Sequence, residues 1–480
     1  MSRLQIHHLD VGQGDSTLIL YYDDNDKPTY SVLIDCGENA AYLRVIDILF
    51  ENRFQFLNTI LLTHYDSDHF SGVIKLIERG VKTRDDFIFN LLAGTQIWDP
   101  GIPGDILEKN FFNNYIIALE NLIKKQRAKG VGLVHRVTGN MNGRTTNSIG
   151  SFNDFTLREF DGWLNDSYVV KDKIQPEWFV PFRSITAGKY NRITAYRQLF
   201  KNKHWPISMD VVNYGRGLAL IDDQTTDFPE QVPLPFSIDI LIGNGTGVKN
   251  EEEKDPLIAM SIDQNVEKAW RDRILNEAGG RRLSITQSND ENDLGMGYLL
   301  KFENFRYWFG GDLTSNQEDA LTDAIGQLSV LKAGHHGSHH SSSIRFLAET
   351  MPKAVIISTA SEWNERVKLP HVSTLGRFES CPSIQAVFMT GMPIPKKIKP
   401  SFLPGPTTPY DANRKFQVAG TDLKASSEII LYVDSSEAVN KEHLFEVRYR
   451  EQNVSSKGKK RKQDANGEEV RQTIKKRRKL

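Results

Sequence analysis

The sequence contains little cysteine, no long apolar run and almost no net charge, and the first two of these absences each argue against a class of protein. Its two cysteines, Cys36 and Cys381, are too few for a disulfide framework in 480 residues, which favours a reducing compartment. No apolar run approaches the roughly 18 residues of a membrane span. Apolar residues make up 39% of the chain and charged residues 25%, which argues against wholesale disorder. We therefore expect a soluble, cytoplasmic, globular protein with no membrane insertion.

The near-zero net charge conceals a basic tail on an acidic body. The chain carries 60 basic and 61 acidic side chains, but residues 457–480 hold eleven basic and three acidic ones. We expect residues 456–480 to form a disordered tail. It could bind the phosphate backbone of nucleic acid, act as a nuclear localisation signal in a eukaryote, or be a solvated segment with no specific role. The candidate nucleic-acid-binding residues are Lys459, Lys460, Arg461, Lys462, Lys475, Lys476, Arg477 and Arg478.

Apolar segments with strand spacing occur in two blocks of the chain, residues 1–82 and 236–455. Helical patterns occupy residues 40–50 and 111–129, and a further helix is expected to begin at Gly72. Between residues 83 and 235 the pattern loosens, and we expect an insertion packed on the main domain. The predicted strands are 4–9, 16–22, 31–34, 59–62, 236–242, 297–302, 306–309, 328–332, 354–358, 386–389 and 429–433.

The strongest chemical signal follows the predicted buried strand 59–62. His64, Asp66, Asp68 and His69 lie within six residues of one another. Imidazoles and carboxylates together make a ligand set that suits zinc, manganese or iron. The alternative is a set of ordinary loop residues, with Asp68 capping the next helix.

Two later segments add candidates of the same kind. Asp312 follows the apolar strand that ends at residue 309, and four of the twelve histidines, His335 and His336 among them, fall within residues 335–340. His371 lies beyond the strand 354–358 and is a further candidate. A histidine cluster on a surface loop can be incidental, and a histidine beside a proline is often structural.

Taken together, the motifs resemble those of metallo-β-lactamase-fold hydrolases, and in particular the metallohydrolase domain of the ComEC-type DNA-uptake family. The resemblance covers about residues 1–80 and 236–435. It implies an αββα sandwich of two mixed sheets with outer helices and a metal site at one edge, plus the large insertion. The segments that carry it are Asp10-Val11-Gly12-Gln13-Gly14-Asp15, Asp35-Cys36-Gly37, the cluster from His64 to His69, Gly311-Asp312 and His335-His336-Gly337-Ser338.

The same resemblance implies roles for individual residues. His64, Asp66, Asp68, His69, Asp312 and His371 would be metal ligands, and Asp312 would bridge two metals. Asp68, His335 and His336 would hold water or move a proton, while Asp15, Asp35 and Ser338 would support the ligands. A separate histidine that the family places between the main motif and Asp312 has no convincing counterpart.

Our primary hypothesis is a metal-dependent hydrolase, most plausibly a phosphodiesterase or nuclease that attacks DNA with a metal-activated water. It would require one or two divalent ions, zinc or manganese. One alternative is a hydrolase of a small substrate such as a cyclic nucleotide, lactone or thioester. The other is an interaction module that has lost its metal. Full-length ComEC proteins carry many membrane spans and this chain shows none, so it is not expected to be an uptake channel.

Overall fold

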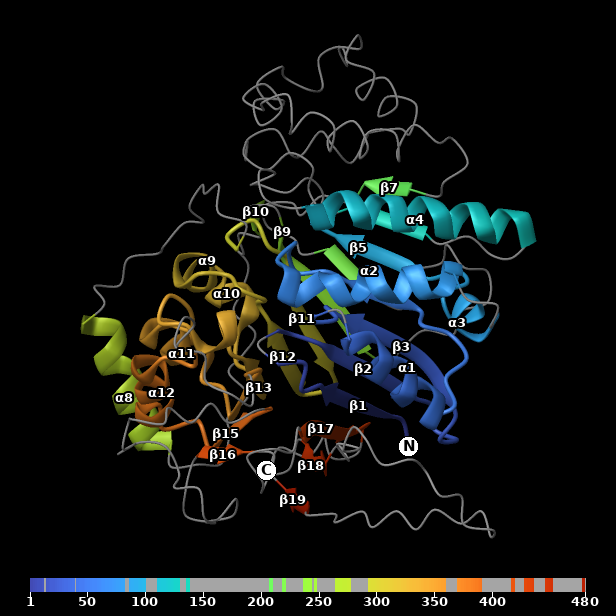
Figure 1. Cartoon of the computed structure of the whole chain (residues 1–480). Helices are drawn as coiled ribbons and strands as arrows, with labels where there is room; N and C mark the ends of the chain where they lie inside the picture. Colours follow the sequence, from blue (N-terminus) through green and yellow to red (C-terminus); the bar gives the residue numbers. More distant parts are fainter. Residues whose placement is uncertain are drawn as a thin grey trace, which may run out of the picture.

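The structure is a computed structural model that describes most of the chain apart from its central and C-terminal segments. The described residues are 1–12, 14–38, 40–82, 86–100, 110–129, 135–138, 207–209, 218–221, 236–243, 246–247, 264–277, 292–359, 369–390, 416–418, 427–435, 445–451 and 477–479. Two mixed β-sheets pack face to face, and helices cover their outer faces (Figure 1). This arrangement confirms the predicted αββα sandwich.

The first sheet has the strand order β19-β18-β17-β1-β2-β3-β4-β5-β6-β7. Strands β1 to β3 form an antiparallel meander, and β3 to β7 run parallel to one another. Parallel neighbours need a crossover connection, and α1, α2 and α4 lie in these connections. The strands are β1 (Arg3–His8), β2 (Thr17–Tyr22), β3 (Pro28–Ile34), β4 (Thr59–Leu61), β5 (Gln96–Asp99), β6 (His135–Thr138), β7 (Ile207–Met209), β17 (Ser427–Asp434), β18 (Glu446–Glu451) and β19 (Arg477–Lys479).

The second sheet has the order β10-β9-β11-β12-β13-β14-β15-β16, and β8 also pairs with β9. It is antiparallel from β9 to β12 and parallel from β12 to β16. The strands are β8 (Leu218–Ile221), β9 (Phe236–Gly243), β10 (Thr246–Gly247), β11 (Gly297–Phe302), β12 (Phe305–Phe309), β13 (Val330–Lys332), β14 (Ala354–Ile357), β15 (Ala386–Met389) and β16 (Phe416–Val418).

The helices form one layer outside each sheet (Figure 1). Those outside the first sheet are α1 (Ala41–Glu51), α2 (Ser67–Lys82), α3 (Asp86–Leu91) and α4 (Asn110–Lys129). Those outside the second sheet are α8 (Gln264–Glu277), α9 (Ser315–Ala320), α10 (Thr322–Ile325), α11 (Ile344–Thr350) and α12 (Val372–Ser380). No helix in the described part of the chain is both long and apolar enough to cross a membrane.

Strand β2 shows why the first sheet is buried on both faces. Ile19 and Tyr21 belong to the apolar core between the sheets, whereas Leu18 and Leu20 belong to the core beneath the outer helices. Successive side chains of a strand point to opposite faces, so the near-continuous apolar run of this strand serves both cores. Burial of each such leucine or isoleucine stabilises the fold by about 1.5–3 kcal/mol.

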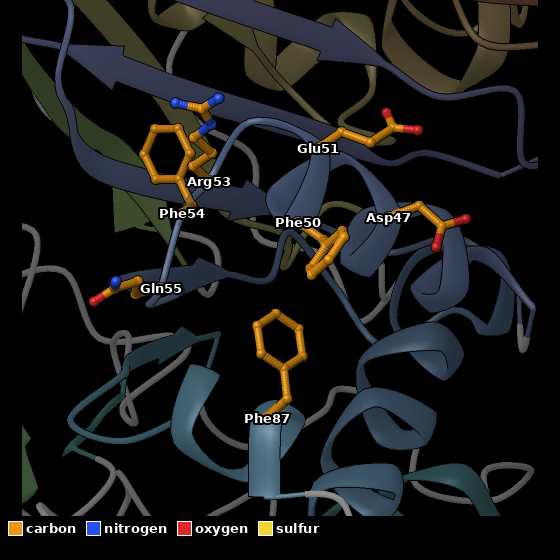
Figure 2. Close-up of a pocket in the computed structure, with 7 residues that line it drawn as sticks. All are labelled: Asp47, Phe50, Glu51, Arg53, Phe54, Gln55 and Phe87. Carbon is orange, nitrogen blue, oxygen red and sulfur yellow. The ribbon is translucent and has the colours of Figure 1, made fainter. Parts of the chain in front are cut away.

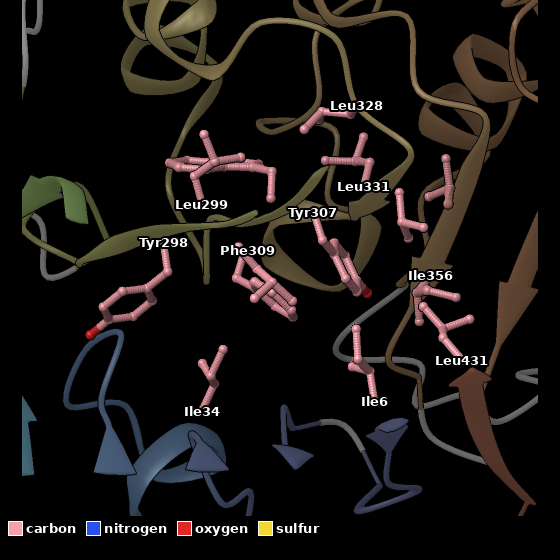
Figure 3. Packing of buried hydrophobic residues seen from close by; sticks show 14 of the residues in the cluster. Ile6, Ile34, Tyr298, Leu299, Tyr307, Phe309, Leu328, Leu331, Ile356 and Leu431 are labelled. Atoms are coloured by element: carbon pink, nitrogen blue, oxygen red, sulfur yellow. The ribbon is translucent and has the colours of Figure 1, made fainter. Parts of the chain in front are cut away.

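The core between the sheets is built from side chains of both halves of the chain. Ile6 and Ile34 of the first sheet face Tyr307 and Phe309 of the second across this layer, and Leu431 contributes from near the C-terminal end (Figure 3). The two halves separated by residues 83–235 therefore share one core. The shared core holds the two sheets in a fixed position relative to each other. The candidate site lies where strand ends of the two sheets meet.

Two segments differ from the sequence-based expectation. Residues 83–235 contribute β5, β6 and β7 to the first sheet and β8 to the second, so part of the expected insertion belongs to the sheets themselves. The end of the expected disordered tail forms β19, which pairs with β18. The backbone N–H and C=O groups of an edge strand are free to pair with a further strand. The spacing of polar and apolar residues in the tail does not predict this pairing. Lys459, Lys460, Arg461, Lys462, Lys475 and Lys476 lie outside the described residues.

Candidate metal centre

The predicted ligands come from strand ends in both sheets. In the first sheet, β4 leads to His64 and Asp66. In the second, β12 leads to Asp312, and the neighbouring parallel strand β13 leads to His335 and His336. Because β12 and β13 run parallel, their carboxyl ends meet at the same edge of the sheet. The sandwich brings that edge against the end of β4.

Helix α2 begins inside the principal motif. It starts at Ser67, so Asp68 and His69 lie in its first turn, whereas the sequence predicted a start at Gly72. The N–H of His69 donates to the carbonyl of Asp66 at 3.0 Å. An acidic residue in a first helical turn interacts favourably with the helix dipole. Because both residues lie in this turn, Asp68 and His69 are held on a helix and not on a loop.

The carboxylate of Asp312 lies at the centre of the cluster and is only 4% exposed. Its Oδ2 atom is 3.9 Å from Nε2 of His64 and 3.5 Å from Nε2 of His335. Its Oδ1 atom is 3.2 Å from Nε2 of His69 and 3.6 Å from Nε2 of His336. Each oxygen of one buried carboxylate therefore faces two imidazole nitrogens.

Two further carboxylates divide this cluster into two groups. Oδ2 of Asp66 lies 3.5 Å from Nε2 of His64, and Oδ2 of Asp68 lies 3.4 Å from Nε2 of His336. Asp312 stands between the groups and is shared by both. We name them the first half-site, His64, Asp66 and His335, and the second half-site, Asp68, His69 and His336.

The donor set fits a divalent cation. Atoms of His64, His69 and Asp312 lie within 4.8 Å of one another, as do atoms of Asp68, His69 and His336, so His69 lies close to donors of both half-sites. Nε2 of His64 is buried and makes no hydrogen bond within the described part of the chain, and such an atom is costly unless a ligand satisfies it. Nitrogen and carboxylate ligands suit zinc and manganese.

Backbone geometry allows adjacent histidines to serve both half-sites. His335 (φ 46°, ψ 50°) and His336 (φ 52°, ψ 27°) both adopt the left-handed conformation. Such conformations cost about 1–3 kcal/mol for each residue other than glycine and cluster at functional sites. Arg377 of α12 helps to hold the loop, donating from Nε to the Ser342 carbonyl at 2.9 Å and from Nη2 to the Ser341 carbonyl at 2.8 Å.

The Nδ1 atoms of His64 and His69 are occupied by neighbouring side chains. Nδ1 of His69 is 2.8 Å from Oδ2 of Asp35, and the Thr63 hydroxyl donates to the same oxygen at 2.6 Å. That hydroxyl oxygen is 3.0 Å from Nδ1 of His64 and can accept its proton. Both rings can then present an unprotonated Nε2 to the centre. Asp35 therefore contacts the predicted ligand His69 directly.

The other two predicted supporting residues have different contacts. Asp15 has Oδ1 at 3.7 Å from Nδ1 of His336, and its backbone N–H donates to the Asp68 carbonyl at 3.1 Å. Ser338 instead shapes its own loop, since its hydroxyl accepts from the His340 N–H at 3.3 Å.

His371 lies next to the histidine loop but is in neither half-site. Its N–H donates to the Gly337 carbonyl at 2.9 Å, and its Nδ1 accepts from the N–H of Ser373 as the cap of α12. Its ring lies 4.8 Å from the ring of His339. The structure therefore gives this residue capping contacts, and its assignment as a ligand stays a prediction.

Electrostatics within the cluster also favour a cation. Burial by itself raises the pKa of the Asp312 carboxyl, but the imidazoles of His69, His336 and His335 outweigh burial and hold this pKa well below its usual range. Burial lowers the pKa of His69, but Asp312 and Asp35 outweigh it and raise that pKa well above the ordinary value. The carboxylates therefore attract positive charge to this point, and metal binding would displace the protons.

The sequence interpretation missed two residues that contact the predicted site residues. Thr63 joins Asp35 to His64, as described above, and it directly precedes the motif. Lys332 is buried at the end of β13, with Nζ 2.6 Å from Oδ1 of Asp15. A lysine at the end of an otherwise apolar strand is the signal that could have identified it, since lysine is almost never fully buried unless it is paired.

A surface pocket of about 710 Å³ lies between α1 and α3, away from these residues (Figure 2). Phe50 and Phe87 line it and meet edge to face, with ring centroids 5.8 Å apart. None of the predicted site residues lines it. Its lining consists of Asp47, Phe50, Glu51, Arg53, Phe54, Gln55 and Phe87.

Comparison with known proteins gives limited matches. No family model matches the chain. The protein named Recombination protein 2 of Haemophilus influenzae is 37% identical over 67 residues, which is 14% of this chain and 8% of that protein. This chain thus spans a small part of that relative's length.

Similar solved structures include three at low identity. The short form of human tRNase Z aligns with a TM-score of 0.32 and 9% identity, over 73% of this chain and 91% of that chain. The metallo-β-lactamase fold protein YhfI from Bacillus subtilis has a TM-score of 0.26 and 10% identity, over 74% and 85%. A diphosphatase from the PhnP family has a TM-score of 0.31 and 10% identity, over 87% and 94%. The assignment of the fold rests on the two sheets and on the motifs at their edge.

Proposed function

We propose that this protein is a metal-dependent hydrolase that cleaves phosphodiester bonds, with DNA as the preferred substrate class. The observation that carries the proposal is the arrangement around Asp312, where each carboxylate oxygen faces its own half-site. A buried carboxylate between two sets of nitrogen and oxygen donors suits a pair of cations.

The residues that would hold the cations are the two half-sites with Asp312 shared between them. A divalent cation there supplies Lewis acidity, which offsets negative charge on the phosphodiester oxygens and makes water a nucleophile near neutral pH. The chain itself orients the ligands: Asp35 and Thr63 occupy the Nδ1 atoms of His69 and His64, so that Nε2 faces the centre. Asp68 is one-quarter exposed and can accept a proton from an attacking water.

The preference for DNA rests on weaker support than the hydrolase chemistry. It draws on the motif resemblance to the ComEC-type family, on the short match to Recombination protein 2, and on the basic tail. A polyanion would be attracted to that tail independently of its sequence.

Purified full-length protein tests the proposal directly. Metal content is measured first, and cleavage is then screened with added manganese or zinc on single- and double-stranded DNA, RNA and cyclic nucleotides. We expect wild type to cleave DNA and Asp68→Ala to lose this activity. Asp239→Asn is the matched control, because Asp239 pairs with Lys301 at 2.9 Å on β9 and β11 and is in neither half-site.

The outcomes separate the alternative functions. Unchanged cleavage by Asp68→Ala would exclude the assigned centre. Cleavage of cyclic nucleotides without cleavage of any polymer would favour a hydrolase of small substrates. Wild-type protein that retains no metal and cleaves nothing would favour an interaction module.

A further inference from the structure

Lys332 is an unusual residue for its position. It ends β13, where its neighbours along the strand are apolar, and its side chain is only 3% exposed. Its Nζ atom lies 2.6 Å from Oδ1 of Asp15. A buried lysine needs a partner to offset the loss of hydration, and the carboxylate of Asp15 provides one. The role of this pair in the site follows from what else Asp15 contacts.

Asp15 joins the two parts of the second half-site. Its backbone N–H donates to the carbonyl of Asp68, and its carboxylate faces Nδ1 of His336 at 3.7 Å. Its own carbonyl accepts from the N–H of Gly37 at 2.7 Å, which ties it to the loop after β3. Asp68 belongs to the first sheet's side of the site, whereas His336 belongs to the second sheet's side. One residue therefore contacts both sides of the site.

In its buried surroundings, Lys332 pairs with the carboxylate of Asp15. His8 is close to Lys332, but burial, followed by the charge of Lys332, lowers the pKa of His8 to about 3, so this ring is neutral. The His8 ring lies between the Thr17 hydroxyl, 3.1 Å from its Nδ1, and the Tyr307 hydroxyl, 3.0 Å from its Nε2. Lys332 is thus buried beside a neutral imidazole, and the Asp15 carboxylate is its ion-pair partner.

We propose that Lys332 is a positioning residue for the second half-site: it holds the Asp15 carboxylate against His336, so that Nε2 of His336 faces Asp68 and the second cation. This inference rests on the proposed metal-dependent function, but it concerns how the cation is held. Residues that act through a metal ligand typically change metal affinity about 10–100-fold.

Cobalt binding to the full-length protein tests the inference without relying on hydrolysis. Cobalt(II) is titrated into wild type, Lys332→Met, Asp15→Asn and the double variant, and visible absorption reports the number of bound ions and their coordination. We expect Lys332→Met to bind one of two ions about 10–100-fold more weakly. The double variant should be no weaker than Asp15→Asn, because Lys332 acts through Asp15. The matched control, Lys301→Met, removes a lysine from a partly exposed ion pair on β11 and should bind as wild type does.

Each other outcome has a definite meaning. Cobalt binding by Lys332→Met at wild-type affinity, or effects that add up in the double variant, would overturn the inference. If Lys332→Met does not fold, the double variant is used instead, because it leaves no unpaired buried charge. The double variant and Asp15→Asn should then bind the second ion with the same reduced affinity. Wild-type affinity in Asp15→Asn would overturn the inference. Wild-type protein that binds no cobalt, zinc or manganese would instead overturn the proposed function.

Discussion

His335 and His336 are adjacent in the chain, yet their Nε2 atoms approach opposite oxygens of the Asp312 carboxylate, at 3.5 and 3.6 Å. Two consecutive left-handed residues produce this divergence. The consequence is that one short loop contributes an imidazole to each half-site. It also means that the first half-site contains two imidazoles, although the separate histidine that the motif resemblance implies has no counterpart.

The two histidines should therefore have separable effects. We expect His335→Ala and His336→Ala each to lose one bound cation. Asp312→Asn should weaken the binding of both cations by more than about 100-fold, because losing a ligand shared by both should reduce affinity more than losing a supporting residue does. Metal content by mass spectrometry and calorimetric titration measure this, with Asp239→Asn as the control. Loss of both ions in each histidine variant would show that the half-sites do not bind independently.

Metal removal should destabilise the protein. A ligand that binds only the folded state stabilises it by about 2.7 kcal/mol when its concentration is 100 times its Kd. We expect a chelator to lower the Tm of wild type and added manganese or zinc to restore it. Asp312→Asn should show the same Tm in both conditions. A wild-type Tm that does not respond to metal would contradict the assignment of the centre.

Gly14 marks the tight packing of the N-terminal loop on the metal motif. A Cβ atom at this position would lie 1.9 Å from the carbonyl oxygen of Asp68. We expect Gly14→Ala to destabilise the fold by about 1–3 kcal/mol and to weaken metal binding, because the Asp68 backbone must move. Denaturant unfolding and metal titration measure the two effects.

The control for this substitution is Gly376→Ala in α12. A Cβ atom at Gly376 would meet nothing within 4 Å. Alanine in a helix interior is about 0.5–1 kcal/mol more favourable than glycine, so this variant should be more stable and should bind metal normally. Equal destabilisation by the two variants would show that the effect is not specific to the contact with Asp68.

Glu318 should make stability depend on pH. Burial raises the pKa of its carboxyl to about 8, only partly offset by the N–H of Ser342, which donates to Oε2. The unfolded chain ionises this group near its ordinary pKa of 4.5, whereas the folded protein keeps it protonated until about pH 8. The folded state therefore binds more protons in this window, and stability falls by up to about 1.4 kcal/mol per pH unit as pH rises.

The variant Glu318→Gln should remove this dependence. Glutamine resembles the protonated carboxyl and has no proton to lose, so the variant should gain stability relative to wild type as pH rises from 5 to 8. Urea unfolding across this range measures the difference, with Glu349→Gln of α11 as the control. A constant difference between wild type and Glu318→Gln across the range would be evidence against a buried, protonated Glu318.

The basic tail makes a separate prediction. Glutamine in place of the basic residues at 459–462 and 475–476 should weaken binding to single-stranded DNA. The slope of log K against log salt should become shallower by about 0.7 for each phosphate that the protein no longer neutralises. Hydrolysis of a small phosphodiester should stay unchanged. Unaltered DNA affinity and salt slope would show that the tail is not a binding platform.

The sequence by itself determined which residues could take part in the chemistry and what kind of fold carries them. The apolar strand before His64 and the strand before His335 were recognisable because their signals are local: each lies in a short run of neighbouring residues. The αββα class was implied by the resemblance of the motifs to those of metallo-β-lactamase-fold hydrolases. The start of α2 at Ser67 was missed because a first helical turn rich in polar residues resembles a loop.

Only the tertiary structure decided how these residues meet. Which imidazole faces which oxygen of Asp312 depends on two sheets that pack through a shared core and on two left-handed residues. The pairing of Lys332 with Asp15, and the addition of β5, β6 and β7 to the first sheet, likewise join segments far apart in the chain. A buried charge needs a partner of opposite charge, and an open strand edge needs a neighbouring strand, so such contacts form between whichever segments the fold brings together. The spacing of apolar residues along the chain does not predict these contacts.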